Sequence, residues 1–397
     1  MLSKNTITFR AGAALLTFLI GIGLATVLAF NRAEPRINPV DLNNESPTLE
    51  MVFVLDTTGS MGGLLEGAKQ RIWGIVNEVM QSPSHPAVKI GLVAYRDRGD
   101  RYVTQVLPLT EDLDKVYTTL MEYEASGGGD APEDVRQALA DGVQKAGWSR
   151  STSRLAQVLF LVGDAPPHND YQDEEDVLAT AGKAMEQGIV VNTIQCGNVS
   201  ETKQVWESIA ERGQGQYFAI PQTGGVQAIA TPYDEELSKL GTKLGGTYVA
   251  YGGGAGAEGD RFRAEAKRTA EVSETTVAGS APAEARALRS INKAVNAKAY
   301  IGDLLQNIEN GSVKLESVAE SDLPEDLKKL SPSERKQEVD KRLAERKEIR
   351  NQILSLSKLR NDYIGAQQKK QGGTGQNSFD VAVTAALKQQ LAKKGIR

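Results

Sequence analysis

Between residues 51 and 220, short apolar runs alternate with longer segments whose apolar residues recur at helical spacing. The apolar runs are continuous, which is typical of strands that are covered on both faces. The predicted strands are 51–55, 88–95, 102–107, 157–162, 189–195 and 216–220. Strands that alternate with helices favour a mostly parallel sheet with helices on both faces. We therefore predict a doubly wound α/β domain over about residues 48–225.

The composition narrows the classes of function. The net charge is -5, and no basic stripe with interleaved aromatic residues is present, so nucleic-acid binding is not expected. The single cysteine, Cys196, excludes an internal disulfide framework and is predicted to be a small buried hydrophobe. With only two histidines, His85 and His168, a zinc site built from His and Cys is not expected.

The N-terminus carries an uncharged apolar run at residues 11–30, after Lys4 and Arg10. About 20 residues of helix span roughly 30 Å, enough to cross a bilayer once. We predict that residues 1–31 are an uncleaved transmembrane anchor, with the bulk of the chain extracytoplasmic. A signal peptide cleaved near residues 27–29 and a buried core helix are the alternatives.

The rest of the chain divides by composition. Residues 32–47 are predicted to be a linker, and residues 226–256 a pendant helix and strand with a glycine-rich break. Residues 257–397 are predicted to be mainly helical, with long helices at 283–309 and 332–368 and an amphipathic helix at 379–393. These helices are candidates for oligomer contacts. A coiled coil is conceivable, but Arg360 interrupts the apolar stripe of the second long helix.

Polar oxygen-bearing residues follow the first predicted strand. The sequence there is Asp56-Thr57-Thr58-Gly59-Ser60. In an open parallel sheet, ligands bind just beyond the carboxyl ends of the strands. A carboxylate and two hydroxyls on one short loop make an all-oxygen surface of the kind that Mg²⁺ prefers. Taken alone, however, Asp56 and Thr58 are also typical of helix N-caps.

Two further segments complete the pattern. Asp164 follows the strand at 157–162, and a glycine-rich loop precedes a helix that Pro132 is predicted to begin, with Glu133 and Asp134 beside it. Together with Asp56 to Ser60, these residues resemble a von Willebrand factor A domain with a metal-ion-dependent adhesion site. The family motif Asp-x-Ser/Thr-x-Ser is matched by Asp56, Thr58 and Ser60, and its later Asp by Asp164. The family usually has a Thr in the glycine-rich loop. Here Asp130 is the candidate for that ligand, and Ser126 the second choice.

The resemblance implies a binding protein and not an enzyme. In the family, Mg²⁺ (or Mn²⁺ or Ca²⁺) held by such residues binds an acidic side chain of a protein partner. The expected function is therefore metal-dependent protein binding by a membrane-anchored chain. His168 near Asp164 is predicted to be a solvated loop residue, and the segment 96–101, which includes Arg98-Gly99-Asp100, a charged turn between strands.

The sequence leaves three alternative functions open. Asp56-Thr-Thr-Gly-Ser also resembles the Asp-Lys-Thr-Gly-Thr of aspartyl-phosphate ATPases, which use the carboxylate as a nucleophile with Mg²⁺. Against that, Thr57 replaces the Lys and no bundle of membrane helices is present. A structural envelope scaffold that acts through the C-terminal helices is the second alternative. A cytosol-facing adaptor for an ATPase chaperone is the third.

Overall fold

The structure, a computed structural model, describes residues 47–129, 131–171, 173, 175–222, 229–296, 298–300, 302–370 and 379–396. Within these residues one sheet has the strand order β3-β2-β1-β4-β5-β6. The strands are β1 (Thr48–Asp56), β2 (Ala87–Tyr95), β3 (Thr104–Thr110), β4 (Leu155–Gly163), β5 (Ile189–Cys196) and β6 (Gln214–Ile220). All neighbours pair in parallel except β2 and β3. The prediction of a mostly parallel sheet is confirmed.

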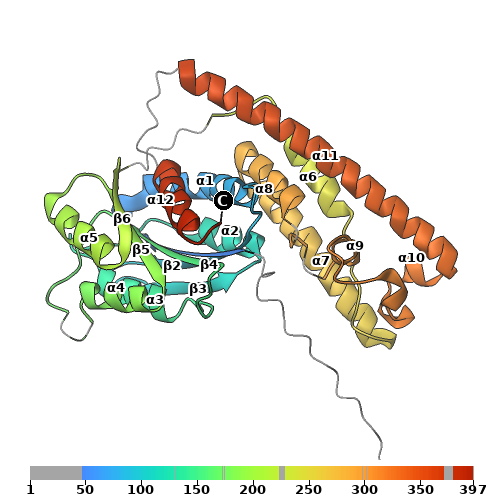
Figure 1. Ribbon diagram of the computed structural model, residues 1–397, viewed down its shortest axis with the longest axis horizontal. Coiled ribbons are helices and arrows are strands. Elements are labelled where there is room, and N and C mark those ends of the chain that lie inside the picture. The colour runs from blue at the N-terminus through green and yellow to red at the C-terminus, as the bar shows by residue number, and fades with distance from the viewer. Residues whose placement is uncertain are drawn as a thin grey trace, which may run out of the picture. The chain divides into compact units, whose positions relative to one another are not determined.

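The two faces of the sheet are both buried, because successive side chains of a strand point to opposite faces. In β1, Met51, Phe53 and Leu55 belong to one hydrophobic cluster, and Val52 and Val54 to another. Helices cover both faces (Figure 1). The first face carries α1 (Gly62–Met80), α2 (Leu113–Glu122) and α12 (Phe379–Lys393), and the second α3 (Val135–Gln144), α4 (Val177–Glu186) and α5 (Ser200–Arg212). The doubly wound architecture is therefore present.

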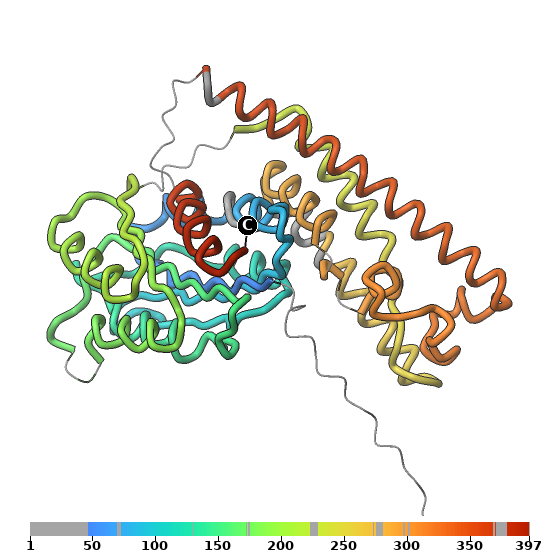
Figure 2. The backbone as a smooth tube through the Cα atoms, in the orientation of Figure 1, coloured from blue at the N-terminus to red at the C-terminus, as the bar shows by residue number. Residues whose placement is uncertain are grey.

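The helix at the end of the chain, α12, packs on the sheet beside α1 (Figure 2). The Phe379 ring lies 6.0 Å from the ring of Phe53 on β1, and Gln390 bonds to Asn192 on β5. The predicted boundaries at 225 and 256 stay predictions. What the structure adds is that the last helix of the chain completes a helical layer of the α/β domain.

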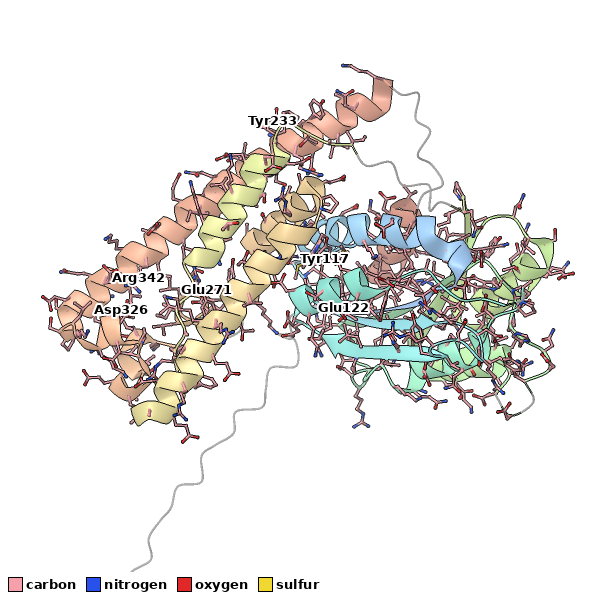
Figure 3. The ribbon with its side chains drawn as sticks, turned by 180° about the vertical axis from the view of Figure 1, so that it is seen from behind. Tyr117, Glu122, Tyr233, Glu271, Asp326 and Arg342 are labelled. Atoms are coloured by element: carbon pink, nitrogen blue, oxygen red, sulfur yellow. The ribbon has the colours of Figure 1, made fainter. Side chains whose placement is uncertain are left out.

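The helices between β6 and α12 form what we call the helical region, residues 234–370. They are α6 (Asp234–Gly246), α7 (Gly256–Ser280), α8 (Ala283–Val295), α9 (Leu304–Glu309), α10 (Glu325–Lys328) and α11 (Pro332–Lys370). Among them α11 packs on α6 and α8, and α8 also packs on α1 of the α/β domain. In Figure 3, Arg342 of α11 lies beside Asp326 of α10, with which it forms an ion pair of 2.7 Å. Short 3-10 turns occur at η1 (Gly59–Met61), η2 (Leu315–Ser317) and η3 (Glu320–Asp322).

Arg360 interrupts the apolar stripe of α11 for a structural reason. Its Nε donates to Oδ1 of Asp234 at 2.8 Å, and both side chains are buried between α11 and α6. The long helix predicted at 332–368 and the helix at 379–393 are confirmed as α11 and α12.

The prediction of one helix over 283–309 is wrong. The chain leaves the helical conformation at Asn296, whose Oδ1 accepts a hydrogen bond from the backbone N–H of Lys298 at 2.8 Å. It begins a new helix after Gly302, at a φ of 73°, and Asp303, whose side chain caps α9 by accepting from the backbone N–H of Gln306. A left-handed residue followed by an Asp cap separates two helices.

The predicted membrane anchor at residues 11–30 lies outside the described residues. Within the described part of the chain, no helix combines the length and apolar character needed to cross a membrane.

Candidate functional site

Two neighbouring strands end at the same edge of the sheet and bring two carboxylates there. β1 ends at Asp56, and β4 ends at Gly163, one residue before Asp164. The two strands pair in parallel from Thr48 opposite Leu155 to Leu55 opposite Val162. Because parallel strands share one carboxyl edge, Asp56 and Asp164 lie in the same region of the molecule.

The Asp56 carboxylate is completely buried, and only one of its oxygens is hydrogen-bonded. Oδ1 accepts from the backbone N–H of Thr58 at 2.8 Å and from its Oγ1 at 2.6 Å. Oδ2 is a buried atom with no hydrogen-bond partner in the described structure. Burial raises the pKa of Asp56 to about 7 against the opposing effect of the Thr58 hydrogen bonds, and the charge of Asp164 also raises it. A bound cation would satisfy such an oxygen and restore the charged form.

The hydroxyl groups of the loop after β1 divide into two sets. Thr58 Oγ1 lies 3.3 Å from Oγ of Ser60, so these two hydroxyls are adjacent and share the side of the loop that faces Asp56. Thr57 turns the other way, where its Oγ1 donates to the carbonyl of Tyr95 at 2.9 Å and lies 2.8 Å from the hydroxyl of Tyr102. The predicted pair, Thr58 and Ser60, is therefore the pair beside the carboxylate.

Asp164 is tied to the same loop by a residue that the sequence did not single out. Nε2 of Gln222, which follows β6, donates to Oδ2 of Asp164 at 2.5 Å and to the carbonyl of Ser60 at 3.3 Å. Asp164 is partly exposed, as is Gln222. One amide thus connects both sides of the site.

Gly163 leaves open the space in front of the free oxygen of Asp56. A Cβ at this position would lie 3.1 Å from Asp56 Oδ2 and 2.3 Å from the hydroxyl of Tyr95. The second distance is far inside van der Waals contact, so only glycine fits here without a shift of Tyr95.

The glycine-rich loop lies against the Asp56 loop. Gly127 accepts a hydrogen bond from the backbone N–H of Gly59 at 3.2 Å, and the backbone N–H of Ser126 donates to the carbonyl of Thr57 at 3.0 Å. Gly128 donates its backbone N–H to Oδ2 of Asp100 at 3.0 Å. Ser126 is exposed. The other candidate for the third ligand, Asp130, lies outside the described residues.

Glu133 is a candidate that sequence reasoning missed. It is 3% exposed, and its Oε2 has no hydrogen-bond partner in the described structure. A Cβ on Gly128 would lie 3.2 Å from both Glu133 Oε1 and Thr58 Cβ, which places the carboxylate beside the predicted hydroxyls. Burial, followed by the charges of Asp56 and Asp97, raises the pKa of Glu133 to about 9. Burial and like charges favour the neutral form, and a nearby cation would favour the charged one.

The helix start predicted at Pro132 is wrong, which explains why Glu133 was missed. α3 begins at Val135, and Asp134 is its N-cap, accepting from the backbone N–H of Gln137 at 3.0 Å. Glu133 therefore precedes the helix and points toward the site. The signal available in the sequence is that this acid directly follows the glycine-rich loop that begins at Gly127.

An aromatic cluster supports the loops around the site. His168 is 7% exposed, contrary to the expected solvated residue, and its ring stacks on Tyr171 at 4.1 Å. The Tyr171 hydroxyl donates to Asp97 at 2.8 Å, and the guanidinium of Arg98 lies 4.0 Å from the Tyr171 ring centroid. The backbone N–H of His168 donates to the carbonyl of Glu133 at 3.2 Å. These contacts fix the segment that carries Glu133.

The donor set fits a hard divalent cation. Asp56, Thr58, Ser60, Glu133 and Asp164 present only oxygen atoms, which Mg²⁺ prefers. In the described part of the chain, no three His, Cys, Asp or Glu side chains are grouped in a metal-binding arrangement. Asp56, Glu133 and Asp164 are three such groups, so one cation would not contact all three carboxylates directly. The hydroxyls of Thr58 and Ser60 and the waters that Mg²⁺ usually keeps would supply the other contacts.

The comparisons with known proteins agree on one domain. Residues 50–232 match the family model described as von Willebrand factor A domain. The human von Willebrand factor A domain-containing protein 7 is 36% identical over 119 residues, which are 29% of this chain and 13% of that protein. This chain therefore matches only a small part of that relative's length.

Two solved structures are also similar. The conserved hypothetical protein BatB from Bacteroides thetaiotaomicron is 18% identical and covers 44% of this chain and 90% of its own, with a TM-score of 0.32. The SpRpn10 VWA domain is 16% identical and covers 47% of this chain and 100% of its own, with a TM-score of 0.33. The family match and the sheet described above lead to one conclusion: residues 50–232 of this chain form a von Willebrand factor A domain, a kind of domain that generally binds proteins.

Proposed function

We propose that this chain is a metal-dependent protein-binding module. In this proposal Asp56, Thr58, Ser60, Glu133 and Asp164 hold one divalent cation, with Mg²⁺ as the first candidate and Mn²⁺ or Ca²⁺ as substitutes. The cation keeps an open coordination position and binds a Glu or Asp side chain of a protein partner. Asp130 stays a predicted additional ligand.

The observation that carries the proposal is the free oxygen of Asp56. A buried carboxylate oxygen without a donor costs free energy, and such groups usually have a role. Glu133, whose Oε1 lies near the same added Cβ as Thr58, has a second buried oxygen without a partner, Oε2. Two carboxylates that oppose each other's ionisation become favourable neighbours once a divalent cation lies between them.

The exposure of the surrounding residues supports capture of a partner's side chain. Asp56 and Thr58 are buried, whereas Ser60, Gly127 and Gly128 are exposed. A cation held by these residues would have its protein ligands below it and solvent above it. That leaves room for a carboxylate that arrives from outside.

The same exposure supports a role that is not enzymatic. A nucleophilic carboxylate has to reach its substrate, whereas Asp56 is 0% exposed and its Oδ1 is occupied by Thr58. We therefore assign the cation a binding role and no part in phosphoryl transfer.

Calorimetric titration of Mg²⁺ and Mn²⁺ into the full chain tests the cation site. We expect binding by the wild type, and at least a tenfold loss of affinity in Asp56→Asn and in Glu133→Gln. Glu122→Gln is the control, since it removes one charge from an exposed position at the end of α2. Unchanged affinity in Asp56→Asn rejects the site.

The partner's carboxylate can be tested separately. An array of acidic peptides, each paired with a copy in which Glu and Asp are replaced by Gln and Asn, is probed with the chain in Mg²⁺ and in EDTA. We expect retention only on acidic peptides and only in Mg²⁺. Equal retention on the amide copies contradicts carboxylate capture.

We also propose that residues 11–30 anchor the chain in a membrane by one span, with the bulk of the chain on the extracytoplasmic side. The support is the length and lack of charge of this run. Carbonate extraction of membranes, followed by protease treatment of intact cells, tests both statements. Release into the soluble fraction contradicts the anchor, and full protection from protease contradicts the orientation.

A further inference from the structure

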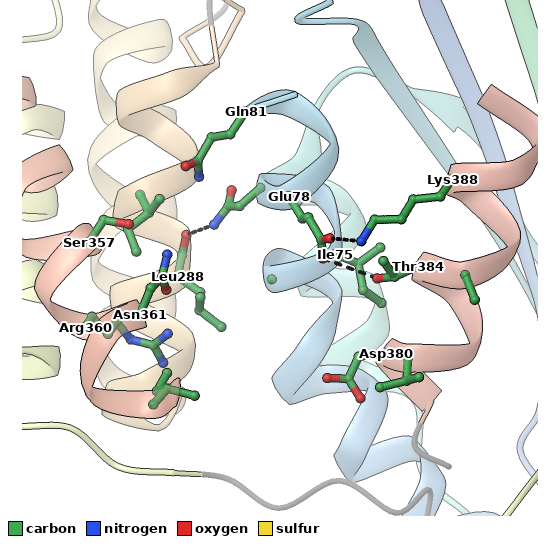
Figure 4. A pocket seen from close by; sticks show the side chains of 16 residues that line it. Ile75, Glu78, Gln81, Leu288, Ser357, Arg360, Asn361, Asp380, Thr384 and Lys388 are labelled. Carbon is green, nitrogen blue, oxygen red and sulfur yellow. Dashed lines mark hydrogen bonds and ion pairs between the residues drawn. The ribbon is translucent and has the colours of Figure 1, made fainter. Parts of the chain in front are cut away.

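Four helices line a cavity that is open to solvent, on the side of the molecule where the helical region meets α1 and α12. Its volume is ≈ 690 Å³, and it is lined by residues of α1, α8, α11 and α12 (Figure 4). Binding pockets for small molecules typically measure about 300–1,000 Å³. The cavity shares no lining residue with the proposed cation site.

The cavity has an aliphatic wall. Ile75 of α1 and Leu288 and Ile291 of α8 are buried beneath it, at 3%, 6% and 2% exposure. From α12 come Val381, which is 44% exposed, and Ala385. An exposed valine beside a cavity is apolar surface that a ligand would remove from water.

The charged groups of the cavity already have partners within the chain. Glu78 of α1 pairs with Lys388 of α12 at 3.1 Å and accepts from Thr384, as the dashed lines in Figure 4 show. Arg360, on the opposite wall, pairs with Asp234 at 2.8 Å and with Glu284 at 3.5 Å, although its Nη2 has no hydrogen-bond partner in the described structure. Asp380 also has an interaction within the chain. A charged ligand would therefore lose its hydration without gaining an uncompensated opposite charge.

Among the neutral polar groups of the cavity, one buried oxygen lacks a hydrogen-bond partner in the described structure. Nδ2 of Asn77 donates to the carbonyl of Leu288 at 2.8 Å, but its Oδ1 has no hydrogen-bond partner in the described structure although Asn77 is 4% exposed. Ser357 and Asn361 of α11 and Gln81, which directly follows α1, also line the cavity. A hydrogen-bond donor on a ligand could satisfy Asn77 Oδ1 after a small shift of the side chain.

We propose that this cavity binds a small neutral molecule with a mainly apolar body and one hydroxyl or amide group that donates a hydrogen bond. The aliphatic wall packs against the apolar body of the ligand, and the neutral polar residues accept the hydrogen bond that the ligand donates. Because the charges are paired, the cavity selects against anions and cations of the same size. This proposal does not depend on the proposed cation site.

Three probes with one ring system and different charges test the ligand class. Naphthylethanol is neutral and carries a donor, naphthylacetate is an anion, and naphthylethylamine is a cation at neutral pH. Binding of each to the full chain is measured by saturation-transfer NMR and by titration of naphthyl fluorescence. We expect naphthylethanol to bind at least about tenfold more tightly than either charged probe.

Matched tryptophan variants on α12 locate the site. Ala385→Trp and Val381→Trp each place an indole in the cavity, whereas Gln389→Trp places one on the exposed side of the same helix. We expect naphthylethanol binding to be lost in the first two variants and kept in the third. Two cavity variants are used so that, if one of them fails to fold, the other still tests the site.

Three results would overturn the proposal. They are no binding of naphthylethanol by the wild type, binding of the charged probes as tight as that of naphthylethanol, and undiminished binding in folded Ala385→Trp or Val381→Trp. Circular dichroism and thermal unfolding of each variant establish that it is folded.

Discussion

Asn192 of β5 and Gln390 of α12 exchange two side-chain hydrogen bonds, although they are 198 residues apart in the chain. Asn192 Nδ2 donates to Gln390 Oε1 at 3.3 Å, and Gln390 Nε2 donates to Asn192 Oδ1 at 2.8 Å. Both residues are buried, at 0% and 4% exposure. This amide pair joins the last described helix to β5 of the von Willebrand factor A sheet.

Replacing Gln390 by Leu should destabilise the chain by about 1–3 kcal/mol, because Asn192 Nδ2 is then buried without an acceptor. Asn192 Oδ1 keeps a donor, the backbone N–H of Gln216 at 3.0 Å. Urea unfolding followed by circular dichroism measures the change. Gln389→Leu, on the exposed side of the same helix, should shift stability by no more than about 0.5 kcal/mol. Equal effects of the two substitutions would show that the amide pair does not stabilise the docking of α12.

Arg289 of α8 binds Asp114 of α2 with two hydrogen bonds of 2.7 Å. Arg289→Met should cost about 3–5 kcal/mol, because it takes one cation away from a mostly buried carboxylate that also pairs with Lys293. Arg286→Met is the control. Its ion pair with Glu235 is more exposed and should be worth about 1 kcal/mol or less. A loss in Arg289→Met that is no larger than in the control contradicts the role assigned to this pair.

The Asp114 carboxylate makes the free energy of unfolding decrease at low pH. Burial alone would raise the pKa of Asp114, but the charges of Lys293 and Arg289 hold it well below its usual range. An unfolded Asp has a pKa of about 3.9. The folded state binds this proton less readily than the unfolded state, so the contribution of Asp114 is complete above about pH 5 and is lost as the pH falls through 4 toward the folded pKa.

Asp114→Asn should therefore remove part of this acid dependence. Unfolding free energies measured between pH 7 and pH 3 should fall less steeply in the variant than in the wild type. Glu122→Gln, an exposed position on the same helix, should leave the wild-type slope unchanged. Parallel curves for wild type and Asp114→Asn would contradict the assignment.

Asp56→Asn should separate folding from cation binding. In EDTA at pH 8 the variant should be more stable than the wild type by about 1–3 kcal/mol, because a buried charge with a free oxygen is replaced by a neutral amide of the same shape. In the wild type, free Mg²⁺ at one hundred times its Kd should add about 2.7 kcal/mol, and in the variant, whose affinity is at least tenfold lower, no more than about 1.4 kcal/mol at the same concentration. Differential scanning calorimetry with and without Mg²⁺ measures both effects. Undiminished Mg²⁺ stabilisation in the variant would place the cation elsewhere.

Gly163→Ala should weaken Mg²⁺ binding by at least about tenfold, because the new methyl group would lie 3.1 Å from Asp56 Oδ2 and 2.3 Å from the Tyr95 hydroxyl. Tyr95 has to move, so some loss of stability is expected as well. Gly365→Ala in α11 is the control, since nothing lies within 4 Å of its added Cβ and it lies outside the proposed cation site. Mg²⁺ titration by calorimetry compares the two at a temperature where both are folded. Wild-type affinity in Gly163→Ala would mean that this space is not used by the cation.

Several contacts could not be predicted from the sequence because they join distant segments. The sequence predicts α12 as an amphipathic helix, but the surface that it covers depends on Phe53 and Asn192, which lie far from it along the chain. His168 was expected in solvent, and the stacking of its ring on Tyr171 buries it. Arg360 appeared as a break in an apolar stripe, and its buried partner Asp234 lies on another helix.

The sequence by itself determined the strands, their alternation with helices and the edge of the sheet where Asp56, Thr58 and Asp164 meet. These features follow from local patterns, since continuous apolar runs favour buried strands and parallel strands share one carboxyl edge. Only the tertiary structure decided that Glu133 turns toward that edge, that Gln222 joins Asp164 to the Ser60 loop, and that the last helix completes the layer on the sheet. The direction of a side chain before a helix, and the partner of a helix face, depend on packing between segments far apart in the chain, which no local pattern records.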